Sequence, residues 1–135
     1  MQRRMLTKED EEAAGEEIEV RREDQNKINR FSRLHQRELM IQEELKTKNK
    51  EKEELDDITA ELELGDEDEP VPYKIGDAFF HVPLPQAQEM LAITGARVDE
   101  DINGLEEKLE TLRDEMTELK VQLYARFGKT INLET

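Results

Sequence analysis

The residue types most often used in catalysis and metal binding are scarce in this chain of 135 residues. It contains two histidines, His35 and His81, and no cysteine. The two histidines fall on different predicted elements, His35 on a helix and His81 on a strand. Metal sites and acid–base pairs need several such side chains held close together. We therefore predict no catalytic residue, no metal ligand and no bound cofactor.

Two short runs look like parts of ligand-binding motifs. Residues 128–130 (Gly-Lys-Thr) match the end of a phosphate-binding loop, but Leu123 occupies the position of that loop's first glycine. The run also follows a predicted helix, where the loop requires a strand. Residues 66–69 (Asp-Glu-Asp-Glu) could attract Ca²⁺, but they lack the glycine and the closing glutamate of an EF-hand loop. We interpret the first run as a helix end and the second as a solvated acidic loop.

The composition excludes several classes of function. A formal net charge of -15 opposes binding to nucleic acid or to an anionic membrane, because both require a cationic surface. With 41% charged and 4% aromatic residues, the chain suits long helices with a thin apolar seam better than a thick core. It has no apolar run of about 18 residues and no recognisable signal or transit peptide. We expect a soluble cytoplasmic protein, with a nuclear role left open.

The segment from Leu91 to Phe127 carries the strongest pattern in the chain. From Val98 on, apolar residues recur at alternating intervals of four and three, which is the seam of a coiled coil. The residues between them are mostly charged or polar, so a helix here is stable only when a partner covers its narrow stripe. The stripe comprises Leu91, Val98, Ile102, Leu105, Leu109, Leu112, Met116, Leu119 and Leu123.

Residues 22–64 supply a partner for this stripe. A second helical pattern runs through them without proline, and Gly65 stands where a helix end favours glycine. If the two helices are antiparallel, facing residues have nearly constant sums of residue numbers, and we therefore predict an antiparallel two-helix coiled coil within one chain. The apolar pairs with sums of 153 to 155 are Leu62 with Leu91, Leu55 with Val98, Leu45 with Leu109, Ile41 with Leu112, Leu34 with Leu119, Phe31 with Leu123, and Ile28 with Phe127.

Residues 46–54 have no apolar side chain and weaken this seam. We expect the aliphatic stems of Lys48 and Lys52 to lie across Ile102 and Leu105 of the second helix, leaving their charges in water.

Residues 70–85 hold all four prolines and interrupt the helical patterns. Apolar residues alternate over 71–75, a Gly-Asp pair follows at 76–77, and residues 79–82 are mostly β-favouring types. This order predicts a short β-hairpin. Because a lone two-stranded hairpin is marginal in water, we expect it to join strands from other chains.

Apolar residues near the chain ends would collect where the first helix begins and the second ends. One interpretation is that they close the coiled coil as an apolar cap. The other is that part of the group stays exposed as an adhesive patch for other proteins. Tyr124, Ile131 and Leu133 fall outside the seam and are the better binding candidates. The group comprises Ile28, Phe31, Leu123, Tyr124, Phe127, Ile131 and Leu133.

The predicted organisation is therefore mainly α-helical. The segments are an acidic N-terminal tail that we expect to be disordered (1–21), a coiled-coil helix (22–64), an acidic loop and β-hairpin (65–84), a second coiled-coil helix (85–127) and a C-terminal tail (128–135).

Three blocks of this sequence resemble prefoldin, and among its subunits the β type. They are EDQNKINRFSRL (23–34), PYKIGDAFF (72–80) and LKVQLYARFGKTINLE (119–134), and QEML (88–91) adds a fourth. The blocks stand in the right order and extend from residue 23 nearly to the C-terminus. The Tyr-x-Ile-Gly-Asp-x-Phe stretch is specific to these subunits, whereas heptads alone would be weak evidence.

The resemblance implies a subunit of a hetero-hexamer, partnered by two α-type and three further β-type subunits. In such a complex the hairpins form a β-barrel platform from which six coiled coils extend. It captures non-native chains, notably actin and tubulin, and delivers them to the cytosolic chaperonin without ATP. The assembly residues would be Val71, Tyr73, Ile75, Phe79 and Val82. The client-binding tip would be Ile28, Tyr124, Phe127, Ile131 and Leu133.

Two other functions stay open on the residues themselves. A structural coiled-coil tether would form a stable homo-oligomer that does not slow the aggregation of a denatured protein. An acidic histone chaperone, suggested by the charge, would bind basic partners in a salt-sensitive way that depends on the first 20 residues.

Overall fold

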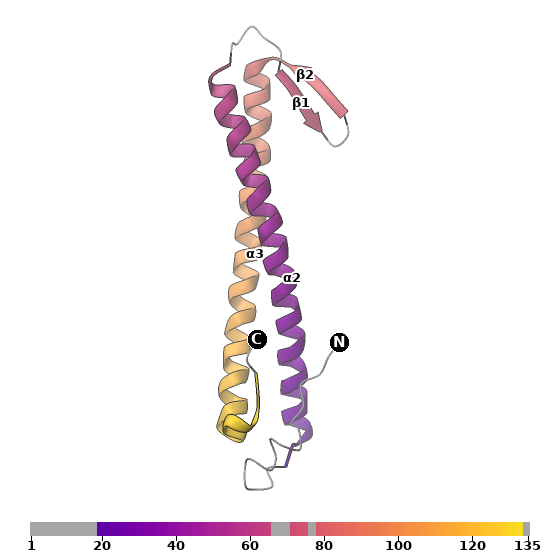
Figure 1. The fold of residues 1–135 in the computed structure, drawn as a ribbon, viewed down its shortest axis with the longest axis vertical. Helices are drawn as coiled ribbons and strands as arrows, with labels where there is room; N and C mark the ends of the chain where they lie inside the picture. Colours follow the sequence, from indigo (N-terminus) through magenta and orange to yellow (C-terminus); the bar gives the residue numbers. More distant parts are fainter. Residues whose placement is uncertain (1–18, 66–70, 76–77, 134–135) are drawn as a thin grey trace. The chain divides into compact units, whose positions relative to one another are not determined.

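Two long helices dominate the computed structural model, which describes residues 19–65, 71–75 and 78–133. Helix α2 spans Arg22–Glu63 and helix α3 spans Leu84–Phe127, and between them strands β1 (Val71–Ile75) and β2 (Ala78–Val82) form an antiparallel pair (Figure 1). A 3-10 turn, η1, covers Gly128–Thr130. The prediction of a mainly helical chain with two long helices is confirmed.

By its contacts the chain forms two compact units. The first, called the terminal unit, contains the described parts of Met1–Glu43 and Glu107–Thr135. The second, called the central unit, is Glu44–Glu106.

In the terminal unit the first half of α2 lies antiparallel to the last part of α3. Three ion pairs between the helices show this direction, because residue numbers rise on α2 while those of the partners fall on α3. Their side-chain atoms are 2.6, 2.9 and 2.8 Å apart in the pairs Asp24 with Arg126, Arg30 with Glu115, and Glu38 with Arg113.

The core of the terminal unit follows the predicted seam. Apolar side chains from both helices are buried along it, and the heptad spacing explains why, since it keeps them on the faces that meet. On α2 the buried apolar residues are Ile28, Phe31, Leu34 and Ile41. On α3 they are Leu109, Leu112, Met116, Leu123 and Phe127.

In the central unit two lysines of α2 reach carboxylates of α3. Lys48 Nζ lies 3.1 Å from Asp101 Oδ2, and Lys52 Nζ lies 2.6 Å from Asp99 Oδ1, again in antiparallel order. Both lysine side chains keep partial access to solvent, as expected for their charges. The sequence analysis did not predict that carboxylates of α3 pair with their ammonium groups.

Outside residues 66–81, the buried apolar residues of the central unit come from α3. They are Leu84, Ala87, Leu91, Val98 and Ile102. Their counterparts on α2, Leu55 and Leu62, are only partly buried.

The helix ends next to the strands differ by one residue from the predicted ones. α2 ends at Glu63, not Leu64, and the Gly65 amide donates to the Leu62 carbonyl at 3.1 Å. A Cβ at Gly65 would come within 3.2 Å of that carbonyl, so glycine suits the position. α3 begins at Leu84, and the Pro83 carbonyl accepts from the Ala87 amide in its first turn.

Candidate functional site

The end where α2 begins and α3 ends carries the largest fully buried side chains of the described chain. Ile28 and Phe31 of α2 are fully buried, and Leu123 and Phe127 of α3 nearly so. Two residues beyond α3 join them, since Ile131 is 6% exposed and Leu133 is 0% exposed. We call these six residues, Ile28, Phe31, Leu123, Phe127, Ile131 and Leu133, the end cluster.

The C-terminal tail reaches the end cluster by a sharp reversal after Phe127. Gly128 has a φ of 60°, a left-handed conformation that glycine adopts without steric cost. The Thr130 hydroxyl donates to the Phe127 carbonyl at 2.5 Å within the turn. Ile131 is then extended, with φ −107° and ψ 136°, and the chain runs back along α3 (Figure 1). Alternate residues of an extended chain share one side, which places Ile131 and Leu133 together.

This arrangement corrects part of the sequence analysis. Ile131 and Leu133 lie outside the heptad seam and were the better candidates if part of the group stayed exposed, but both are buried. Ile28 and Phe127 are buried too, and Tyr124 is partly buried. The structure therefore agrees with the interpretation as an apolar cap. A role of these five residues in client contact stays a prediction.

A charged group covers one edge of this end. Arg126 of α3 donates from Nε to Asp24 Oδ2 at 2.6 Å and from its terminal nitrogen to the Glu19 carbonyl at 2.5 Å. The same Asp24 oxygen accepts from the Arg21 amide at 2.9 Å, which caps the start of α2. Asp24 is only 4% exposed, so its charge is compensated inside the protein. Sequence reasoning missed this link, because its residues are far apart in the chain.

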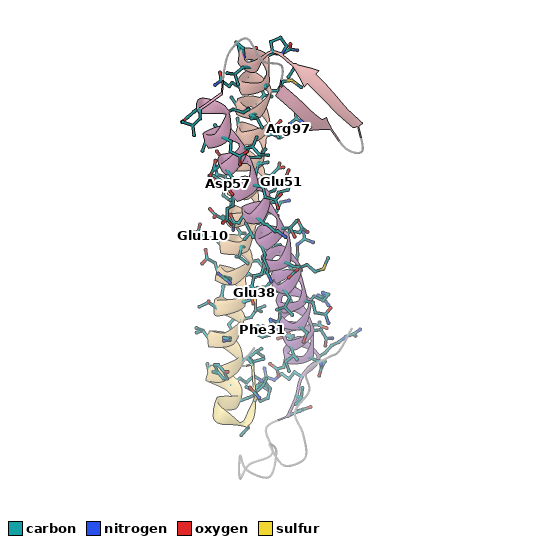
Figure 2. All side chains as sticks on the ribbon, turned by 45° about the horizontal axis from the view of Figure 1, so that its top comes forward. Phe31, Glu38, Glu51, Asp57, Arg97 and Glu110 are labelled. Carbon is teal, nitrogen blue, oxygen red and sulfur yellow. The ribbon has the colours of Figure 1, made fainter. Side chains whose placement is uncertain are left out.

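A second polar group lies in the seam at Glu38, which Figure 2 labels on α2 together with Phe31. Arg113 Nε donates to Glu38 Oε2 at 2.8 Å, and His35 Nδ1 lies 3.4 Å from Glu38 Oε1. Desolvation by burial raises the pKa of Glu38, but the hydrogen bonds from Arg113 and His35 outweigh it, so the pKa falls below the ordinary 4.5. Glu38 is therefore charged at neutral pH.

The two lysines of the central unit have raised pKa values, whereas the pKa of Glu38 is lowered. The hydrogen bond to Asp101 raises the pKa of Lys48, and Glu51 adds to the effect. The hydrogen bond to Asp99 likewise raises the pKa of Lys52. Both ammonium groups stay charged at physiological pH, as ion pairs between the helices require.

The register of β1 and β2 divides the predicted assembly residues between two faces. Val71 pairs with Val82, Tyr73 with Phe80 and Ile75 with Ala78, so these six positions share one face. Phe79 pairs with Lys74 and belongs to the other face. The predicted turn at residues 76–77 lies outside the described residues.

Neither a metal site nor a membrane span is found in the described chain. No three of its His, Asp and Glu side chains are grouped in a way that could hold a metal ion. Neither α2 nor α3 contains a stretch apolar enough to cross a lipid bilayer.

Comparison with known proteins identifies the family. Residues 25–130 match the family model described as "Prefoldin subunit". The chain is 46% identical to prefoldin subunit 4 of Saccharomyces cerevisiae over 112 residues, which cover 83% of this chain and 87% of that protein. It is 41% identical to prefoldin subunit 4 of Homo sapiens over 123 residues, covering 90% and 92%.

A solved structure agrees at the level of the fold. The prefoldin beta subunit from Thermococcus strain KS-1 matches with a TM-score of 0.73 at 16% identity, covering 82% of this chain and 96% of that one. The family match extends over both helices and the strand pair between them. The fold of the chain therefore matches that of a prefoldin subunit, and the sequence of residues 25–130 matches the prefoldin family model. The chain belongs to the prefoldin family.

Proposed function

We propose that this chain is a β-type subunit of a hetero-hexameric prefoldin, in the position that prefoldin subunit 4 occupies. Its partners would be two α-type and three further β-type subunits. The complex would capture non-native proteins, actin and tubulin among them, and deliver them to the cytosolic chaperonin without ATP. The prefoldin family is a family of non-enzymatic chaperones, so we assign this chain a binding role in the cytoplasm.

The observation that carries the proposal is the extent of the sequence match. Identity of 46% and 41% extends over more than four fifths of both this chain and its relatives. A long coiled coil by itself would support many functions, because heptads recur in unrelated proteins.

The strand pair supports a role in assembly. Among the described residues, β1 and β2 pair only with each other, so the outer edge of each strand is unpaired, and such an arrangement is marginal in water. We propose that strands of neighbouring subunits pair with these edges and complete a β-barrel. Val71, Tyr73, Ile75, Phe80 and Val82 share a face in the register and would lie on its apolar side.

A role of the end cluster in client contact is part of the same proposal. The cluster gathers apolar residues where α2 begins and α3 ends, and they would have to be uncovered to meet a client. The contacts made by one subunit would be weak. Once a client chain is bound by one subunit, however, its effective concentration at the other subunits of the complex is high. Capture by many weak contacts also allows fast release to the chaperonin.

Co-expression with the five other prefoldin subunits of one species tests this proposal. We expect a complex with one copy of this chain and a fixed ratio of partners, which suppresses the aggregation of chemically denatured actin. Omitting this chain should leave the complex incomplete. A homo-oligomer that ignores the other subunits and does not slow aggregation would contradict the proposal and favour a structural tether.

A further inference from the structure

We propose that the surface of α2 and α3 beneath residues 131–133 is a binding site for extended, alternately apolar peptide segments, and that these residues are its resident occupant. An incoming segment would displace the tail and take its place. We call this surface the tail site. The inference rests on the proposed function, because the incoming segment would belong to a non-native client.

The conformation of the tail is the first argument. Ile131 is extended, and Ile131 and Leu133 are buried while Asn132 between them is exposed. This is how an extended ligand is bound, with alternate side chains inserted and the others in solvent. A non-native protein presents such segments, because its backbone is not committed to helices. The tail therefore has the features of a bound client segment.

The second argument is that the tail can leave without unfolding the helices. It follows the end of α3 and is joined to it through Gly128, whose φ of 60° makes the reversal. Burying two aliphatic side chains is opposed by the conformational entropy of ordering the segment from Gly128 to Leu133, and the two terms are of similar size. Beyond the end cluster, Leu34 and Ile41 of α2 are buried along the heptad seam.

The third argument is what lies at the same end of the coiled coil as the tail. Ile28 and Phe31 of α2 and Leu123 and Phe127 of α3 are buried there together with Ile131 and Leu133. Ser32 lies one helical turn from Ile28, is 6% exposed, and its hydroxyl has no hydrogen-bond partner among the described residues. A buried hydroxyl is usually paired. Ser32 could donate to, or accept from, the backbone of a segment whose position differs slightly from that of the tail.

Occupation by the tail would also explain why an apolar binding site can exist on this chain without self-association. With the tail closed, the apolar side chains of the end cluster are buried and do not meet those of other subunits, and an arriving segment competes with the tail for the tail site. The apparent affinity for a client is then reduced by the fraction of molecules whose site is open.

The test uses the full chain and a fluorescent synthetic peptide with the sequence of residues 129–135, Lys-Thr-Ile-Asn-Leu-Glu-Thr. Leu133→Asp should release the tail, because a carboxylate cannot replace a fully buried leucine. We expect this variant to bind the peptide about tenfold more tightly than the unmodified chain, by fluorescence anisotropy. The matched control is Val121→Asp, which adds the same charge at an apolar position of α3 that is 64% exposed and should bind like the unmodified chain.

The peptide needs its own control. The same peptide with aspartate at the position of Leu133 should not bind the Leu133→Asp chain. Equal affinity for both peptides, or no gain in affinity for Leu133→Asp while circular dichroism shows intact helices, would overturn the proposal.

Hydrogen exchange on the unmodified chain covers the case in which Leu133→Asp does not fold. Excess peptide should speed exchange at the chain's own residues 131–133 and leave α2 and α3 protected. If residues 131–133 exchange only when the helices unfold, or ignore the peptide, the tail is a permanent part of the core. Neither measurement involves other prefoldin subunits, so failure to assemble with them would refute the proposed function and leave this test unaffected.

Discussion

Arg126 and Asp24, which are 102 residues apart in the sequence, form an ion pair of 2.6 Å that joins the last turn of α3 to the first turn of α2. The carboxylate is almost completely buried, whereas the guanidinium keeps partial access to solvent. Asp24 also accepts from the Arg21 amide, so one side chain both caps its own helix and holds the other. Removing the charge of either partner should therefore lower the stability of this end of the coiled coil.

Replacing Arg126 should therefore cost more stability than replacing Asp24. Arg126→Gln leaves a buried carboxylate without its partner and should lower the free energy of unfolding by about 3 kcal/mol. Asp24→Asn removes the charge but keeps an oxygen for the Arg21 amide, and should cost about 1 kcal/mol. Urea unfolding followed by circular dichroism measures both.

The exposed pair of Arg30 and Glu115 provides the control for this comparison. Arg30→Gln removes an ion pair of 2.9 Å whose side chains are about half exposed, and should cost less than about 1 kcal/mol. Equal effects of Arg126→Gln and Arg30→Gln would show that burial of Asp24 does not matter.

The pKa of Glu38 predicts a pH-dependent difference between the unmodified chain and Glu38→Gln. Because the pKa is lowered from 4.5, Glu38 adds stability above 4.5 that is lost as pH falls through its value in the folded chain. Glu38→Gln should be less stable by about 1 kcal/mol at pH 7. The difference should shrink as the pH falls below 4.5 and vanish once the carboxyl is protonated in the folded chain as well.

The difference between the two proteins is the quantity to measure, because the chain carries a net charge of -15 and its many other acids titrate in the same range. Thermal unfolding from pH 3 to 7 gives it directly. Glu118→Gln, which removes the same charge at an exposed position of α3, is the matched control. A difference for Glu38→Gln that stays constant with pH would show that the ionisation of Glu38 is not involved.

Two glycines should respond to alanine in opposite directions. At Gly128, where φ is 60° and a Cβ would meet nothing within 4 Å, alanine should cost about 1 kcal/mol through backbone strain alone. At Gly104, inside α3 and equally free of close neighbours, alanine should stabilise by about 0.5–1 kcal/mol. Denaturant unfolding measures both, and a destabilising Gly104→Ala would show that the helix is irregular there.

The strand register predicts which aromatic residues matter for assembly. Tyr73→Asp and Phe80→Asp place charge on the face shared with Val71 and Val82, and should prevent co-purification with the other prefoldin subunits while the helices persist. Phe79 is paired with Lys74 on the other face, so Phe79→Asp should assemble more completely than Tyr73→Asp or Phe80→Asp. Size-exclusion chromatography of the co-expressed subunits separates these outcomes, and a stronger effect of Phe79→Asp would refute the assignment of the faces.

The sequence by itself determined the helices, their antiparallel direction and the strand pair. A heptad pattern repeats over many turns, so each apolar residue adds to the same signal and errors at single positions do not change the result. Constant sums of residue numbers, such as 153 for Leu34 with Leu119, then allow only one direction for the helices. The proline-bounded segment between them has the alternation typical of strands.

The tertiary structure decided the contacts that follow no period. Ile131 and Leu133 are buried because a left-handed glycine turns the tail back on the helices, and six residues are too few to show a repeating pattern. The pairing of Asp24 with Arg126 depends on which carboxylate faces which guanidinium once the helices are aligned. In a chain with 35 acidic residues, the sequence offers many such partners, and only the distances in the folded chain select among them.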